Sequence, residues 1–316
     1  MWDATPEITR AVTRRQARVS LELVLAPGEN RVAVQARNRH GPSEPEIRLV
    51  TRDATGGPGL KRPDLCLLAI GVSEYANPQY NLGYAHADAE AMTRVLAAQE
   101  GRFYGQVRTR LLTDREADRE GVIEGLEWLQ RAGTQNDLAV IFIAGHGIKE
   151  RGQYYFLGHD ADPNRARVTG VKWREFIETM EQLPGIRWLL ADTCRAGAIT
   201  GKRGQTSQGM TRDAADVTDA LRELEEVEGG VVVMSAATGR EVSVESRDWR
   251  HGAFTKAIIE GLEEGRAPHA GDGIIRIREL DAYVTGRVRA LTDGEQHPMT
   301  EVPRMMTNFP VAVCEV

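Results

Sequence analysis

The sequence predicts an α/β fold in which a mostly parallel central sheet carries helices on both faces, preceded by a small all-β segment. From residue 65 onward, continuous apolar runs alternate with segments of helical periodicity. Strands buried on both faces have such runs, and strands that alternate with helices form parallel sheets. Before residue 53, short alternating runs are separated by Pro-Gly and His-Gly-Pro turn sequences, which is typical of antiparallel hairpins.

Residues 1–52 are expected to form part of an immunoglobulin-like sandwich. Alternating runs at 19–23 and 32–36 are parted by APGEN, and a third strand is expected near 47–50. A complete sandwich needs about 100 residues, so either this is a partial module docked on its neighbour or the chain was cut from a longer protein, and we favour the second. The segment is a candidate contact for an upstream regulatory domain or a partner. Residues 53–63 are predicted to be a linker, and 64–316 a second domain.

The elements of the second domain follow from its apolar patterns. Strands are expected at 65–72, 107–113, 138–145, 186–192 and 230–237. Helical spacing of apolar residues predicts helices around 85–96, 122–129 and 217–227. Consecutive strands are usually neighbours in space, so the strands at 138–145 and 186–192 are expected to lie close together.

Composition excludes several classes of protein. The chain has 316 residues, a hydrophobic fraction of 41% and a net charge of −6, which is ordinary for a soluble protein and gives no reason to expect nucleic acid. No apolar run approaches a membrane span, and the N-terminus is too polar for a signal peptide. Three cysteines, far apart and odd in number, argue against disulfides and zinc, so a reducing cytoplasm is expected.

Two residues that carry nucleophilic chemistry follow neighbouring strands. His146 comes after the strand at 138–145, between Gly145 and Gly147, and Cys194 comes after the strand at 186–192. Functional groups in open α/β sheets gather at the carboxyl ends of strands. A thiolate paired with an imidazole is the minimum equipment for nucleophilic catalysis, and the backbone amides of Gly147 and Cys194 are candidate donors to an oxyanion.

The motifs around these residues resemble those of the caspase-like cysteine peptidases, which include caspases, metacaspases and bacterial relatives. FIAGHG is followed by DTCRAG, and LAIGVSEYANPQYNLGYAHADAEAM resembles the opening strand, loop and helix of the family. GAFTKAIIEGL and IRELDAYVTGRV resemble its C-terminal helices, so the likeness covers roughly residues 64–300. The resemblance implies a caspase-like fold with His146 and Cys194 as the catalytic pair.

The resemblance also implies a specificity for basic side chains. Asp192 stands two residues before the cysteine, as in metacaspases, where caspases have glutamine and cut after aspartate. Asp88 lies where metacaspases place a second acid of the same pocket, whereas Ala144 replaces their serine. Two carboxylates attract a guanidinium or ammonium group, so the implied substrates are proteins or peptides cut after arginine or lysine.

The segment 195–213 is expected to be a surface loop, because it is rich in glycine and small polar residues. Caspases are cut into two subunits at the equivalent place. Lys202, Arg203 and Arg212 are therefore candidate self-cleavage positions, and a loop that stays intact is the alternative.

No cofactor is required by this chemistry. GDGIIRIREL resembles the second half of a calcium-binding EF-hand loop, but the first ligand positions carry no carboxylate, so a turn leading to a helix is expected. HDADP at 159–163 leaves activation by calcium open, as in many metacaspases, with a solvated acidic loop as the alternative.

Together these features predict a cysteine endopeptidase that cuts after arginine or lysine. Two alternatives remain: a catalytically silent caspase-like scaffold that binds partners through its β segment, and another thiol hydrolase on the same fold. Cys194 as a buried structural thiol, and Asp88 and Asp192 as capping or solvated acids, are the simpler interpretations of single residues. Cys66 and Cys314 lie in apolar stretches and are expected to be inert.

Overall fold

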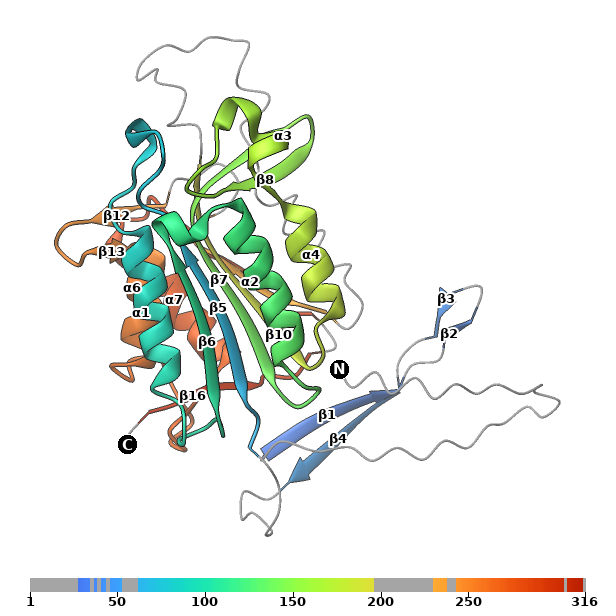
Figure 1. Ribbon diagram of the computed structural model, residues 1–316. Helices are drawn as coiled ribbons and strands as arrows, with labels where there is room; N and C mark the ends of the chain where they lie inside the picture. Colours follow the sequence, from blue (N-terminus) through green and yellow to red (C-terminus); the bar gives the residue numbers. More distant parts are fainter. Residues whose placement is uncertain are drawn as a thin grey trace.

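The main body of the protein is an eight-stranded sheet between two layers of helices (Figure 1). The computed structural model describes residues 28–34, 37–38, 41–43, 46–52, 62–195, 230–237, 243–303 and 306–314. The strand order is β15-β11-β10-β7-β5-β6, and β8 and β9 extend the sheet beside β7.

Five strands of this sheet are parallel: β5 (Leu65–Gly71), β6 (Val107–Thr113), β7 (Leu138–Glu150), β10 (Ile186–Arg195) and β11 (Val232–Ser235). Three short strands pair antiparallel: β8 (Gln153–Leu157), β9 (Val171–Lys172) and β15 (Met299–Glu301). The prediction of a mostly parallel sheet is confirmed.

Six α-helices occur among the described residues. Helices α1 (Ala85–Ala97), α6 (Ala253–Leu262) and α7 (Ile277–Leu291) cover one face of the sheet. Helices α2 (Arg119–Ala132) and α4 (Trp173–Gln182) cover the other, and α3 (Ala166–Thr169) is a single turn near β8. Alternate residues of β5 enter the two cores: Leu65, Leu67 and Ala69 pack in the first, and Cys66, Leu68 and Ile70 in the second. No helix in these ranges has the length and apolarity needed to cross a bilayer.

Short elements complete the domain. The 3₁₀ helices are η1 (Pro78–Tyr80), η2 (Asp114–Ala117) and η3 (Pro163–Arg165). Strands β12 (Glu245–Ser246) and β13 (His251–Gly252) form a hairpin before α6. Strand β14 (Ile274–Arg276) pairs antiparallel with β16 (Pro310–Val313). A turn after Asp272 therefore leads through β14 into α7, where the sequence predicted a turn directly before a helix.

The N-terminal segment contains a two-stranded antiparallel ribbon. Strand β1 (Gly28–Val34) pairs with β4 (Glu46–Arg52), and β2 (Arg37–Asn38) pairs with β3 (Gly41–Pro42) between them. The predicted strands at 32–36 and 47–50 overlap this ribbon. The predicted strand at 19–23, and the predicted helix at 217–227, lie outside the described residues. The domain limits 1–52, 53–63 and 64–316 stay predictions.

Gly71, the last residue of β5, lets the first turn of α1 approach the sheet. A Cβ atom at Gly71 would lie 2.2 Å from the carbonyl oxygen of Ala85 and 2.8 Å from the Cβ of Ala89. No side chain fits at such distances, so α1 rests directly on the strand. This contact fixes the N-terminal end of α1, which carries Asp88.

We expect Gly71→Ala to destabilise the domain by about 2 kcal/mol or more, because overpacking against backbone atoms cannot be relieved by a rotamer change. Gly286→Ala is the matched control: Gly286 is exposed in the interior of α7, and its added Cβ would meet nothing within 4 Å. That substitution should stabilise by roughly 0.5–1 kcal/mol, the usual gain of alanine over glycine in a helix. Urea unfolding of both variants measures the difference. Equal stability of the two variants would contradict the close contact between β5 and α1.

Candidate active site

The predicted catalytic residues lie on adjacent strands at the same level. In the parallel pairing of β10 with β7, Cys194 is the register partner of His146, and Asp192 is the partner of Ala144. Neighbouring strands are about 4.8 Å apart, so the backbones of the two candidate residues are side by side. This is the carboxyl edge of the parallel sheet, where functional groups were expected.

The sequence suggested that His146 lies at an exposed strand end, and the structure does not place it there. Strand β7 continues to Glu150, because its last five residues pair antiparallel with β8. His146 is therefore inside the strand, and only 4% of its surface is exposed. The extension across β8 buries the residue beyond the point where the apolar run ends.

Hydrogen bonds define the tautomer of the His146 ring. Its Nε2 lies 2.8 Å from the backbone carbonyl oxygen of Tyr80. A carbonyl oxygen only accepts hydrogen bonds, so Nε2 carries the proton and Nδ1 holds the lone pair in the neutral ring. Nδ1 is buried and has no hydrogen-bond partner within the described part of the chain. The ring thus has one nitrogen anchored and the other available to take a proton.

Burial lowers the pKa of His146, and the hydrogen bond to Tyr80 offsets part of that effect. The imidazole is therefore predominantly neutral at pH 7, the state that a proton acceptor requires. The ring also lies against Tyr75, with ring centroids 5.1 Å apart. The Tyr75 hydroxyl accepts a hydrogen bond of 2.9 Å from the backbone N–H of His146.

The loop between β5 and α1 holds both tyrosines in place, and sequence reasoning missed their role. Asp114 accepts hydrogen bonds from the backbone N–H groups of Ser73 and Glu74, each 2.8 Å long. The Asn81 side chain accepts one from the N–H of Tyr75. Tyr80 acts through its backbone carbonyl, so its side chain gives no signal of this role in the sequence.

Gly147 is required by the close approach of Tyr154. A Cβ at Gly147 would lie 1.8 Å from the Tyr154 hydroxyl. That hydroxyl donates a 3.0 Å hydrogen bond to the side chain of Thr193, between Asp192 and Cys194 in β10. Tyr154 therefore ties β8 to the segment that carries the candidate nucleophile.

A small cavity at the same sheet edge is lined by acidic side chains. Its walls are formed by Leu82, Ala85, Asp88, Ala144, Gly145, Asp192, Glu245 and Gly252. Asp88 and Asp192 are both buried, with 2% and 5% of their surfaces exposed. The structure brings the two predicted pocket acids together, and Ala144 lines the wall between β7 and β10.

Gly252 stands between the two aspartates. A Cβ at Gly252 would lie 2.7 Å from Oδ2 of Asp192 and 3.2 Å from Oδ2 of Asp88. Its N–H also donates to Asp88, at 3.1 Å to Oδ2. The missing side chain therefore keeps both carboxylates open to the cavity.

Glu245 is a third acid of the cavity that sequence reasoning missed. Its carboxylate accepts hydrogen bonds from the N–H groups of Gly83 and Tyr84, at 2.9 and 3.2 Å. These bonds fix β12 to the loop before α1. Glu245 stands in a segment without periodicity or motif, so no pattern in the sequence indicated its position.

Burial raises the pKa of both aspartates. The pKa of Asp192 rises to about 6, although hydrogen bonds from Ser243 and Thr255 favour its charged form. The pKa of Asp88 rises well above its ordinary value, through burial and then through repulsion by Asp192. Ionisation of Asp88 and Asp192 in the folded protein therefore lowers its stability.

The other candidate groups have local structural roles. Burial raises the pKa of Cys66 to about 11, which makes it a poor nucleophile, and Cys314 is half-buried beside Gly273. In HDADP, Asp160 accepts a hydrogen bond from the N–H of Arg119, and Asp162 caps η3.

The candidate self-cleavage positions Lys202, Arg203 and Arg212 lie outside the described residues, so self-cleavage stays a prediction.

We expect Asp192→Asn to stabilise the fold at alkaline pH. The folded pKa of about 6 exceeds the ordinary value of 3.8, so the stabilising effect of this carboxyl is present below pH 3.8 and is lost as the pH rises through 6. The gain from the substitution should be about 2 kcal/mol larger at pH 8 than at pH 4.5. Urea unfolding of both proteins at the two pH values measures it. A gain independent of pH would show that Asp192 carries no buried charge.

Comparison with known proteins bears on the family and the fold of the chain. The caspase domain matches the chain over residues 64–310. The crystal structure of protein GSU0716 from Geobacter sulfurreducens is similar in fold, with a TM-score of 0.57 and 18% identity, and the match covers 80% of this chain and 100% of that one. Caspase-1 from Spodoptera frugiperda gives a TM-score of 0.45 at 14% identity, over 76% of this chain and 86% of that one. No curated protein sequence is significantly similar. The chain belongs to the family of caspase-domain cysteine peptidases.

Proposed function

We propose that the protein is a cysteine endopeptidase that cuts peptide bonds after arginine or lysine. The observation that carries this proposal is the cavity lined by Asp88, Asp192 and Glu245. Its lining includes Ala144 of β7 and Asp192 of β10, the two strands that bring His146 and Cys194 into register. A substrate side chain in the cavity would place its own backbone near the two catalytic residues.

In the proposed mechanism, the Cys194 thiol transfers its proton to Nδ1 of His146, and the thiolate attacks the scissile carbonyl carbon. The imidazolium that forms donates from Nε2 to the carbonyl of Tyr80, which orients the ring and stabilises its charge. The backbone amides of Gly147 and Cys194 would bind the oxyanion. His146 then returns the proton to the leaving amine, and an acyl-enzyme remains.

Water completes the cycle. His146, neutral again after the amine has left, takes a proton from the water that attacks the acyl-enzyme carbonyl. The thiolate of Cys194 leaves and is reprotonated. Burial supports this role because it keeps the pKa of His146 below its ordinary value, so the ring gives up its proton readily.

The charge of the cavity supports the choice of substrate. A guanidinium or ammonium group would gain charge-assisted hydrogen bonds from the carboxylates, whereas an acidic side chain would be repelled by them. Within the described ranges, no lysine or arginine forms an ion pair with Asp88, Asp192 or Glu245. The substrate would supply the missing cation.

We expect Cys194→Ala to abolish hydrolysis of a fluorogenic peptide ending in arginine, and His146→Ala to lower kcat by about a hundredfold or more, the usual contribution of acid–base catalysis. Cys314→Ala and His269→Ala, which remove the same side chains away from the site, should retain activity. Near-normal turnover by His146→Ala would refute the assignment. Absence of turnover by the wild type on every peptide would favour the silent scaffold instead.

The pocket variants should lose activity selectively. Asp192→Asn and Glu245→Gln keep the shape of the cavity and remove a charge, so kcat/KM for arginine and lysine peptides should fall at least about tenfold. Asp281→Asn on α7, which does not line the cavity, is the control. Comparison with a peptide that has a neutral residue before the scissile bond separates specificity from folding. An equal loss on both peptides would assign the acids a structural role, and hydrolysis of simple amides without side-chain preference would favour another thiol hydrolase.

A further inference from the structure

His251 contacts Asp88, one of the two buried aspartates of the cavity. Its Nδ1 lies 2.8 Å from Oδ1 of Asp88, and the two residues come from elements far apart in the sequence. Asp88 is almost fully buried, whereas 20% of the His251 side chain is exposed. The pair thus reaches from the cavity to solvent, and a proton on it has a path out.

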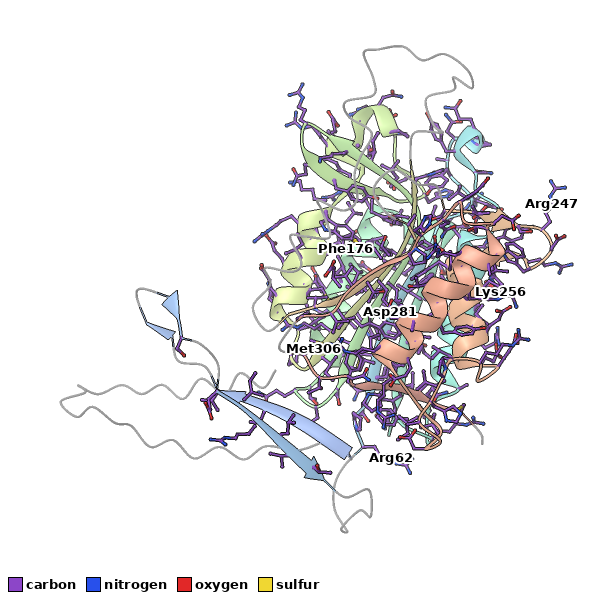
Figure 2. The ribbon with its side chains drawn as sticks, turned by 180° about the vertical axis from the view of Figure 1, so that it is seen from behind. Arg62, Phe176, Arg247, Lys256, Asp281 and Met306 are labelled. Carbon is purple, nitrogen blue, oxygen red and sulfur yellow. The ribbon has the colours of Figure 1, made fainter. Side chains whose placement is uncertain are left out.

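The hairpin of β12 and β13 places the parts of this arrangement. Glu245 is the register partner of Gly252, and Ser246 is the partner of His251. Two adjacent residue pairs of one short hairpin therefore supply three parts of the site. These are the carboxylate of Glu245, the imidazole that contacts Asp88, and Gly252, which stands between the two aspartates. In Figure 2, Arg247 at the tip of the hairpin points away from the body of the domain, so its charge is directed away from the cavity.

Carboxylates that line one small cavity disfavour each other's ionised form, because like charges repel. Asp88, Asp192 and Glu245 line one cavity, and His251 is the one titratable base that forms an ion pair with any of them in the part of the chain that the structure describes. The groups that act on Asp88 are Asp192, Glu245 and His251. A proton held between Asp88 and His251 would relieve part of this repulsion.

The surroundings of His251 oppose a permanent positive charge on it. Burial lowers its pKa, and Lys256 on α6 and Arg94 on α1 lower it further. Lys256 lies on the α6 face seen in Figure 2, where it pairs with Glu260. Burial and Asp192 raise the pKa of Asp88, which favours the same shared proton from the other side of the hydrogen bond.

We propose that His251 is a specificity-determining residue, which shares one proton with Asp88 in the empty cavity, and that an entering guanidinium or ammonium group displaces this proton to solvent. The inference rests on the proposed function and adds the way in which the charge of the pocket is set. The balance is simple: one cation enters, one proton leaves through His251, and Asp88 becomes a carboxylate that pairs with the ligand. A neutral side chain displaces no proton, so the pocket it enters carries one negative charge fewer than the pocket that holds a cation.

Linked binding gives a direct test in the Cys194→Ala protein, which cannot react. The probes are butylguanidine and its uncharged isostere butylurea, titrated by NMR between about pH 6.5 and 8, above the pKa of about 6 of Asp192. Release of one proton requires the Kd of butylguanidine to tighten by about tenfold per pH unit where the pair is protonated. The Kd of butylurea should not change with pH.

His251→Asn separates the proton from the hydrogen bond. The amide Nδ2 of asparagine can still donate to Asp88, but it cannot take up or release a proton. We expect the slope of log Kd against pH to fall at least by half in this variant. His269→Asn, the same change in the loop at the other end of α6, should leave the slope unchanged.

The outcomes are distinct. If the slope of log Kd against pH were the same in the wild-type pocket and in His251→Asn, the proton would lie on the carboxyl groups alone, and the role of His251 would be overturned. Butylguanidine binding without pH dependence in the wild-type pocket would overturn proton displacement whatever the variant does. If butylguanidine bound no better than butylurea at any pH, the proposed pocket for basic side chains would be wrong, and the present inference would fall with it.

Discussion

The parallel pairing of β7 with β10 is the constraint on which the site depends. It brings the backbone of Cys194 beside that of His146, and two residues earlier it brings Asp192 beside Ala144. A shift of one residue would move every side chain of a strand to the opposite face of the sheet. The two apolar cores hold the register, because alternate residues of the central strands are buried on opposite faces. Packing of ordinary hydrophobic residues therefore determines where the chemistry can take place.

The same edge of the sheet carries buried acids that repel one another. Asp88 and Asp192 are buried with raised pKa values, and Glu245 adds a third negative group. Such an arrangement lowers the stability of the empty protein, since buried carboxylates lose hydration that hydrogen bonds only partly replace. By contrast, Glu260 is held by Arg287 and Lys256, which lower its pKa to about 2. No lysine or arginine pairs with the acids of the cavity in the described ranges, where His251 is the one base that pairs with any of them, so a cationic ligand would relieve repulsion that the fold itself relieves only in part.

The sequence predicted the parallel strands of the sheet better than the surroundings of the candidate site. The apolar runs gave the parallel strands, because burial on both faces leaves a continuous pattern. Helix α4 was missed although Trp173, Phe176, Ile177 and Met180 have helical spacing, so that signal was present. The motifs located His146 and both aspartates, but the burial of His146 depends on β8, whose antiparallel pairing no local pattern announces. Tyr80 acts through a carbonyl that every residue possesses.

Three further residues of the site were missed for one shared reason. Glu245, His251 and Gly252 belong to a hairpin with two residues in each strand, too short for any periodicity. Its position comes from tertiary contacts, namely the bonds of Glu245 to the loop before α1 and of His251 and Gly252 to Asp88. The strands of the sheet thus hold the candidate catalytic residues, while a hairpin outside the sheet completes the cavity. The hairpin of β12 and β13 pairs with neither β7 nor β10. Its residues can therefore change the charge of the pocket without moving the register of these two strands.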